Sequence, residues 1–341
     1  MTYLLNIPFE ILLQITSYLT TPEYGYLRRT CKQLEATLFG VFTKEFFSKR
    51  HFAMVEFSLQ ALVDISKSRL GPSLTHLIIR LGRPVCFQED HRRRIPPELA
   101  SWAITRNHAY AECVSFHELI TSGSDLEMLT EAIKNLPNLE TIGMRDFDSE
   151  SRHRDRTSWN GYGCPSKLRN IHFILSIGGD FDREGIPLHY PSHVFLTILR
   201  AMGNAAVSGY GTKLTRFEVI LHTCLLRDQA FKIPDRLSAG IQLALNKLTT
   251  IFLDGLYYTT PNPYVVSGSH GKASQGYLFF FSRFLVRLPA LEHLRINFRH
   301  FIRNGSNKFL KWLAKAREES SDATSTSLCS LSSANVSNRC P

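Results

Sequence analysis

The sequence predicts an α/β fold, in which a short helical module at the amino end precedes an irregular array of helix–strand units. Three observations predict it. An apolar stripe with helical spacing, begun by a proline, occupies residues 8–19. A short pattern of leucine and other apolar residues recurs six times between residues 74 and 296. Several copies of that pattern follow amphipathic helical stretches, which is typical of proteins built from tandem units.

The first helix is predicted to begin around Pro8. A proline is favoured in a first helical turn because its missing N–H would have no partner there anyway. The apolar positions that follow are Ile11, Leu12, Ile15, Tyr18 and Leu19. This spacing places them on one stripe of a helix. Thr20-Thr21-Pro22-Glu23 then ends that helix and begins a second, and a third apolar run reaches Phe47.

Three short helices bury little apolar surface by themselves. Two interpretations of these helices follow. Either they dock on the rest of the chain, or their apolar stripe is a docking face for another protein, in the manner of a helix bound in a groove.

The same residues resemble the F-box family. The resemblance covers about residues 4–47 and lies in Ile7-Pro8-Phe9-Glu10-Ile11-Leu12 and in the later pair Cys31-Lys32. It implies a three-helix F-box at residues 1–50, which binds the Skp-type adaptor of a cullin–RING ubiquitin ligase. The residues that it implies lie in or near this contact are Ile7, Pro8, Ile11, Leu12, Ile15, Leu19, Leu27 and Cys31.

The recurring pattern is a leucine, two residues, an apolar residue, one further residue and another apolar residue. Its leading positions are Leu74, Leu139, Leu168, Leu214, Leu248 and Leu291. Helical stretches at residues 125–135, 193–202, 238–246 and 279–288 precede copies of it. Tandem helix–strand units of this kind predict a leucine-rich-repeat solenoid, similar to the degenerate repeats attached to many F-box proteins. The alternative is an ordinary α/β domain with helices packed on a sheet.

The array is predicted to occupy residues 51–319. Its leading leucines are 29 to 65 residues apart, so the units are irregular and carry insertions. A helix at residues 307–319 is expected to cap the last unit. Ser and Thr dominate residues 320–341 without any periodicity, which predicts a disordered tail.

Two insertions carry runs of basic residues and could bind a partner. The arginines concerned are Arg92, Arg93, Arg94, Arg152, Arg154 and Arg156. Solvated loops are one interpretation. A second is contact with an acidic or phosphorylated protein target, since the guanidinium group pairs well with phosphate. A third is nucleic-acid binding, with Trp159 and Tyr162 available to stack on bases.

The composition excludes several classes of protein. Of the 341 residues, 43% are hydrophobic and 21% charged, and the net charge of +10 permits acidic partners without identifying one. None of the seven cysteines lies within four residues of another, which favours a reducing compartment. The apolar amino end lacks the basic region of a signal peptide, and no stretch reaches the roughly 18 apolar residues of a membrane span. We therefore expect a cytoplasmic or nuclear protein.

No catalytic pattern is found in the sequence. Phosphate-binding glycine loops and the GxSxG elbow are absent. His117-Glu118 begins like a zinc-protease motif, but Thr121 occupies the place of the second histidine. We expect no enzyme activity, no cofactor and no metal.

The predicted function is that of a substrate-receptor subunit of a Skp–cullin–F-box ligase, which recruits an unknown protein for ubiquitination. An F-box scaffold outside ubiquitin transfer, a basic nucleic-acid-binding protein and an unrecognised hydrolase remain alternatives.

Overall fold

A computed structural model describes residues 6–81, 114–148, 154, 162, 190–211, 213–222, 224, 226–257 and 278–299. Three helices form the amino end: α2 (Phe9–Ser17), α3 (Thr21–Arg29) and α4 (Lys32–Phe46). The strands after them are β1 (Lys49–Ala53), β2 (His76–Arg80), β3 (Thr141–Arg145), β4 (Arg216–Ile220), β5 (Thr250–Tyr257) and β6 (His293–Arg299). The helices between the strands are α5 (Glu56–Lys67), η1 (Gly71–Ser73), α7 (Ser124–Lys134), α9 (Tyr190–Val207), η4 (Asp228–Phe231), α10 (Asp235–Leu245) and α11 (Phe279–Val286).

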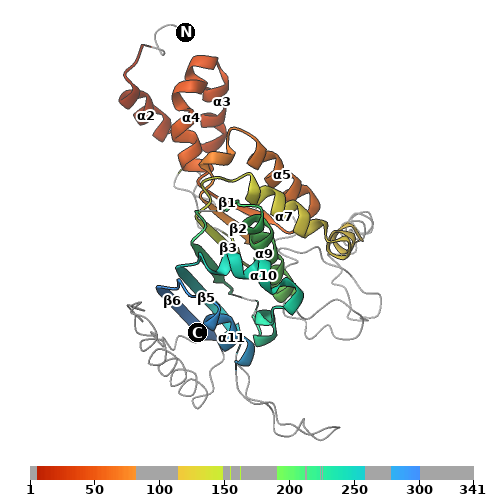
Figure 1. Cartoon of the computed structure of the whole chain (residues 1–341). Helices are drawn as coiled ribbons and strands as arrows, with labels where there is room; N and C mark the ends of the chain where they lie inside the picture. Colours follow the sequence, from red (N-terminus) through yellow and green to blue (C-terminus); the bar gives the residue numbers. More distant parts are fainter. Residues whose placement is uncertain are drawn as a thin grey trace, which may run out of the picture.

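The three N-terminal helices enclose a small core of their own. We call residues 6–47 the N-terminal module. Its buried apolar side chains are Leu12, Tyr24, Leu34, Leu38 and Phe46. Thr20 and Glu23 form a capping box at the start of α3, which satisfies backbone donors that a helix end leaves free. The module lies at one end of the molecule, above the sheet in Figure 1.

The six strands form one parallel sheet, and their order in the sheet is their order in the chain. This confirms the predicted α/β fold, with N-terminal helices followed by alternating helices and strands. The two apolar positions of the recurring pattern lie in register across β2 to β6. One ladder contains Leu77, Ile142, Phe217, Ile251 and Leu294, and the next contains Ile79, Met144, Val219, Leu253 and Ile296.

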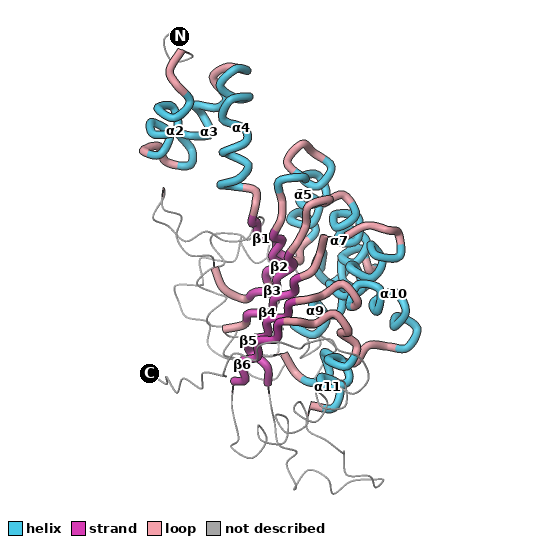
Figure 2. The backbone as a smooth tube through the Cα atoms, turned by 60° about the vertical axis from the view of Figure 1, so that its left-hand side comes forward, coloured by secondary structure: helices cyan, strands magenta, loops and turns pink. Residues whose placement is uncertain are grey.

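Helices cover one face of the sheet. Figure 2 shows α5, α7, α9, α10 and α11 along the same side of the strands. Both apolar ladders contribute to the core that these helices enclose, together with Leu62, Ile133, Phe195 and Phe284. Alternate strand residues point to the opposite face, because side chains along a strand alternate between the two sides of a sheet. We call that opposite side the polar face.

The sequence patterns located five of the six strands. The pattern missed β1, because Arg50 occupies the position that pairs with Leu77. β1 also begins at Lys49, so the strand crosses the boundary that we predicted at residue 50. The copy at Leu168 lies outside the described residues, and β3 pairs directly with β4. The expected helix at 307–319 and the tail at 320–341 also lie outside the described residues.

Candidate functional site

Helix α2 presents an apolar ridge that the module does not cover. The chain turns into this helix at Pro8, whose carbonyl accepts a hydrogen bond of 3.0 Å from the Leu12 N–H. Ile11, Ile15 and Tyr18 follow at intervals of four and three residues, and so lie on one side of the helix. Ile11 is 46% exposed, Ile15 38% and Tyr18 81%. We call Pro8, Ile11, Ile15 and Tyr18 the apolar ridge.

Leu12 belongs to a different side of the same helix. One residue further along an α-helix turns the side chain by about 100°. Leu12 is accordingly only 3% exposed and packs in the module core. In the structure the Leu12 side chain therefore packs inside the module, whereas the Ile11 side chain is exposed and open to a partner.

The other side chains expected near an adaptor are partly buried. Leu19, Leu27 and Cys31 pack against the module core, and Ile7 is half-buried before the helix begins. The Cys31 sulfur accepts the backbone N–H of Leu34 at 3.5 Å, so the thiol caps α4. Tyr18 was in the predicted stripe but not among the expected contacts. Its position three residues after Ile15, on the same side of the helix, was the signal that could have added Tyr18 to the expected adaptor contacts.

Arg154 lies against the N-terminal module. Its guanidinium group pairs with the Glu45 carboxylate, with Nη2 2.9 Å from Oε2, and donates to the carbonyl oxygens of Leu19, at 3.1 Å, and Thr16. It also lies 4.9 Å from the ring centre of Tyr24. Burial is the main cause that raises the pKa of the Tyr24 hydroxyl, and the Glu45 charge adds to it. Arg154 therefore joins α2 and α4 to a segment that follows β3.

The other basic residues proposed for target binding lie outside the described residues. They are Arg92, Arg93, Arg94, Arg152 and Arg156. Their prediction as contacts for an acidic or phosphorylated partner stays a prediction.

The polar face has a charged cluster at its centre. The Glu218 carboxylate on β4 lies 2.8 Å from Arg216 Nε, 3.4 Å from Arg145 Nη2 and 3.6 Å from His76 Nε2. Desolvation lowers the pKa of His76 to about 4, although the Glu218 charge acts in the opposite direction. Desolvation, aided by the Arg145 charge, lowers the pKa of His51 on β1 to about 3. Both imidazoles are therefore neutral at pH 7.

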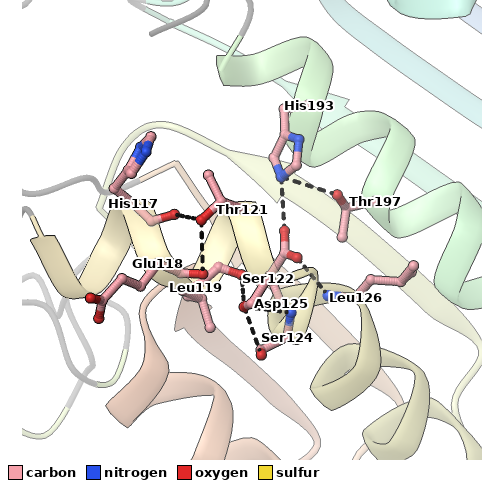
Figure 3. Close-up of polar contacts among 10 residues, drawn as sticks. All are labelled: His117, Glu118, Leu119, Thr121, Ser122, Ser124, Asp125, Leu126, His193 and Thr197. Atoms are coloured by element: carbon pink, nitrogen blue, oxygen red, sulfur yellow. Dashed lines mark hydrogen bonds and ion pairs between the residues drawn. The ribbon is translucent and has the colours of Figure 1, made fainter. Parts of the chain in front are cut away.

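A second polar cluster joins α7 and α9 but lacks the geometry of a catalytic site (Figure 3). Asp125 Oδ2 lies 2.8 Å from His193 Nε2, and Thr197 Oγ1 lies 3.3 Å from the same nitrogen. A catalytic triad instead holds the carboxylate and the nucleophile on different imidazole nitrogens. Nearby, the Thr121 hydroxyl donates to the backbone carbonyl of His117. In the part of the chain that the structure describes, no three His, Cys, Asp or Glu side chains could hold a metal ion.

The comparison with protein-family models places an F-box domain at residues 4–38, which include α2, α3 and the apolar ridge. No leucine-rich-repeat model was identified, although the parallel sheet in chain order fits a leucine-rich-repeat-like array. The searches of curated proteins and of solved structures gave no match. Within the described ranges, none of the helices has the length and apolarity needed to cross a bilayer.

Proposed function

We propose that this protein is a substrate-receptor subunit of a Skp–cullin–F-box ubiquitin ligase. The N-terminal module would bind the Skp-type adaptor, and the helix–strand array would hold a protein target near the ubiquitin carrier. Ubiquitin transfer would take place on other subunits, so the protein would contribute proximity and not chemistry.

The exposure of the apolar ridge carries this proposal. Ile11 and Ile15 on α2 and Tyr18 at its carboxyl end are exposed, within the matched F-box region, while the module closes its core without them. Burying an isoleucine is worth roughly 1.5–3 kcal/mol before the costs of ordering. Two or three such side chains can dominate the affinity of an interface.

The array supplies the rest of the proposal. It is a body of sheet and helices whose core is separate from that of the N-terminal module. A second surface for a protein target is the natural role of such a body in an adaptor-binding protein. The basic residues Arg92–Arg94, Arg152 and Arg156 make an acidic or phosphorylated target our first choice, whereas the Arg154 guanidinium group is already paired with Glu45.

The test of adaptor binding uses two ridge variants and one matched control in the full-length protein. Ile11→Asp and Ile15→Asp should each weaken binding of a purified Skp-type adaptor at least about tenfold, because a charge replaces a buried anchor. Leu243→Asp is the control. Leu243 on α10 is 46% exposed, as Ile11 is, but it lies in the array. Calorimetry gives the affinities, and circular dichroism checks that each variant is folded.

Ridge variants that bind the adaptor as wild type would overturn this proposal, as would a wild-type protein without affinity at micromolar concentration. The target is sought by affinity capture from cells with wild-type protein and Ile11→Asp, read by mass spectrometry. A captured protein that is ubiquitinated only with the wild type is the expected target. Captured proteins that are never ubiquitinated would favour a scaffold outside ubiquitin transfer.

A further inference from the structure

We propose that Arg69 and Arg154 form a two-point lock that holds the N-terminal module in one orientation on the array. Both arginines come from segments of the array, and both contact helices of the module. In this role they are positioning residues, since neither belongs to the apolar ridge. Their importance for target presentation rests on the proposed function, whereas the lock itself does not.

The first point of the lock is a fork between Arg69 and Glu35. Arg69 lies between α5 and η1, and its Nη1 and Nη2 donate to the two carboxylate oxygens of Glu35 on α4, at 3.2 Å and 2.5 Å. The hydrogen bond from Arg69 is the main cause that lowers the pKa of the Glu35 carboxyl. The same guanidinium group lies 4.3 Å from the ring centre of Phe39. Arg28 of α3 also pairs with Glu35 at 3.1 Å, so one carboxylate joins two module helices to the array.

The second point is Arg154, which acts on the helix that carries the ridge. Its donors reach the carbonyl oxygens of Thr16 and Leu19 at the carboxyl end of α2. A positive charge is favourable at the carboxyl end of a helix, and the Thr16 carbonyl accepts the Leu19 N–H at 3.2 Å as well. Its ion pair with Glu45 joins the same contact to the last turn of α4. The Arg154 side chain is 11% exposed and the Glu45 side chain 35%, so the ion pair is partly shielded from solvent.

The spacing of the two points makes them a lock. Glu35 and Glu45 lie ten residues apart on α4, which is about 15 Å along the helix axis. One contact would leave the module free to rotate about it. Two separated contacts, together with the covalent joint at Phe47 and Ser48, oppose rotation of the module more strongly than either contact alone. The joint is also short, and the Ser48 carbonyl accepts the N–H groups of Thr75 and His76 at 3.0 and 2.9 Å.

The test measures the distance between the two bodies in the full-length protein. Spin labels are introduced as noncanonical amino acids at Ala36 on α4 and Glu127 on α7, both exposed, so that native cysteines stay unlabelled. Pulsed electron spin resonance then gives the distribution of the distance between the labels. The wild type should give one narrow distribution. R69Q/R154Q should broaden it, because each released pair raises the ratio of displaced to seated modules about three- to fivefold.

Two further variants keep the result interpretable. R29Q/R236Q is the matched control: it removes two arginine charges at exposed positions of the module and the array. It should leave the distribution narrow. E35Q/E45Q removes the carboxylates that Arg69 and Arg154 contact and should also broaden it, but less than R69Q/R154Q, because the Arg154 hydrogen bonds to Thr16 and Leu19 remain. Circular dichroism checks that the helices of each variant remain formed.

A distribution that stays narrow in both R69Q/R154Q and E35Q/E45Q would overturn the lock, and so would broadening in only one of them. Adaptor binding separates this result from the proposed function. Because Arg69 contacts α4 and not the helix that carries the ridge, R69Q alone should bind the adaptor with wild-type affinity. If the wild type did not bind the adaptor, the proposed function would be refuted. The measured distances would still show whether the two arginines hold the module in one orientation.

Discussion

His76 on β2 and Glu218 on β4 meet across the strand between them, with Nε2 3.6 Å from Oε2. On β3, the strand between them, His76 pairs with Thr141 and Glu218 pairs with Gly143. A Cβ atom built at Gly143 would lie 3.5 Å from His76 Nε2 and 3.3 Å from a side-chain carbon of Ile78. The missing side chain therefore allows polar groups on non-adjacent strands to interact on the polar face.

Glu218 should be a strong contributor to the stability of the array. Its side chain is 7% exposed, and Arg145 beside it is 14% exposed. Glu218→Ala would leave a buried guanidinium group without its counter-charge, at a cost of about 3 kcal/mol. Arg216→Ala is the comparison, because its side chain is 51% exposed and its ion pair is worth less than about 1 kcal/mol. Urea unfolding measures both. Equal losses for the two variants would contradict the assignment of Glu218 as the centre of the cluster.

The two neutral histidines predict loss of stability in acid. The pKa of His51 is lowered to about 3 and that of His76 to about 4, from an ordinary value of 6.5. The unfolded chain therefore takes up protons first as the pH falls below 6.5, and stability is lost from there towards pH 4 and 3. Between pH 7 and 5.5 each histidine should contribute about 1 kcal/mol of destabilisation. Urea midpoints across this range measure the slope, and His76→Gln should make it shallower. An unchanged slope in that variant would refute the prediction.

The packing of α9 on α10 predicts opposite effects for two glycine variants. A Cβ atom at Gly203 would lie 2.8 Å from the carbonyl carbon of Gly240, closer than real contacts. Gly203→Ala should therefore force the helices apart and cost about 1–3 kcal/mol. At Gly240 the added Cβ atom would meet only Val207 Cγ2, at 3.6 Å. Gly240→Ala should be neutral or stabilising by up to about 1 kcal/mol, since alanine favours helices. Thermal unfolding of both variants tests this difference, which would vanish if the two helices were not in backbone contact.

Variants of Leu12 and Ile15 on α2 should affect the stability of the module and adaptor binding separately. Leu12→Ala removes a buried side chain from the module core and should cost about 2–5 kcal/mol. Ile15→Ala removes a side chain that is 38% exposed, and should change the stability of the module by less than about 1 kcal/mol. Under the proposed function, Ile15→Ala nevertheless weakens adaptor binding. Hydrogen exchange of the module and calorimetry with the adaptor measure the two effects. A destabilised Ile15→Ala variant would place that side chain in the core instead.

Much of the array was predictable because its signal is local. In β2 to β6, each strand has apolar side chains at alternating positions directed towards the helices, and this is visible in the sequence as a leucine followed at fixed offsets by two apolar residues. β1 was missed because its first helix-side position holds Arg50, whose side chain lies 4.9 Å from the ring centre of Phe47. A local rule cannot anticipate such a substitution.

The candidate site was predictable only in part. Helical spacing placed Ile11, Leu12 and Ile15 on one stripe, because a stripe of about 100° includes all three. It could not say that Leu12 would turn inward, since this depends on where α4 packs. The contact of Arg154 with Glu45 joins residues 109 positions apart. From the sequence, Arg154 could be recognised only as one of several basic residues in an insertion. Its pairing with Glu45 could be seen only once the fold was known.

Among the residues that the structure describes, each strand of the sheet pairs with the strands that precede and follow it in the chain. The connection from β3 to β4 is more than twice as long as that from β4 to β5, yet the residue register continues unbroken. The length of the chain between two strands therefore does not determine how those strands pair. Evolution could lengthen or exchange these connections without rebuilding the sheet, and a ribosome could complete the strands one after another as the chain emerges.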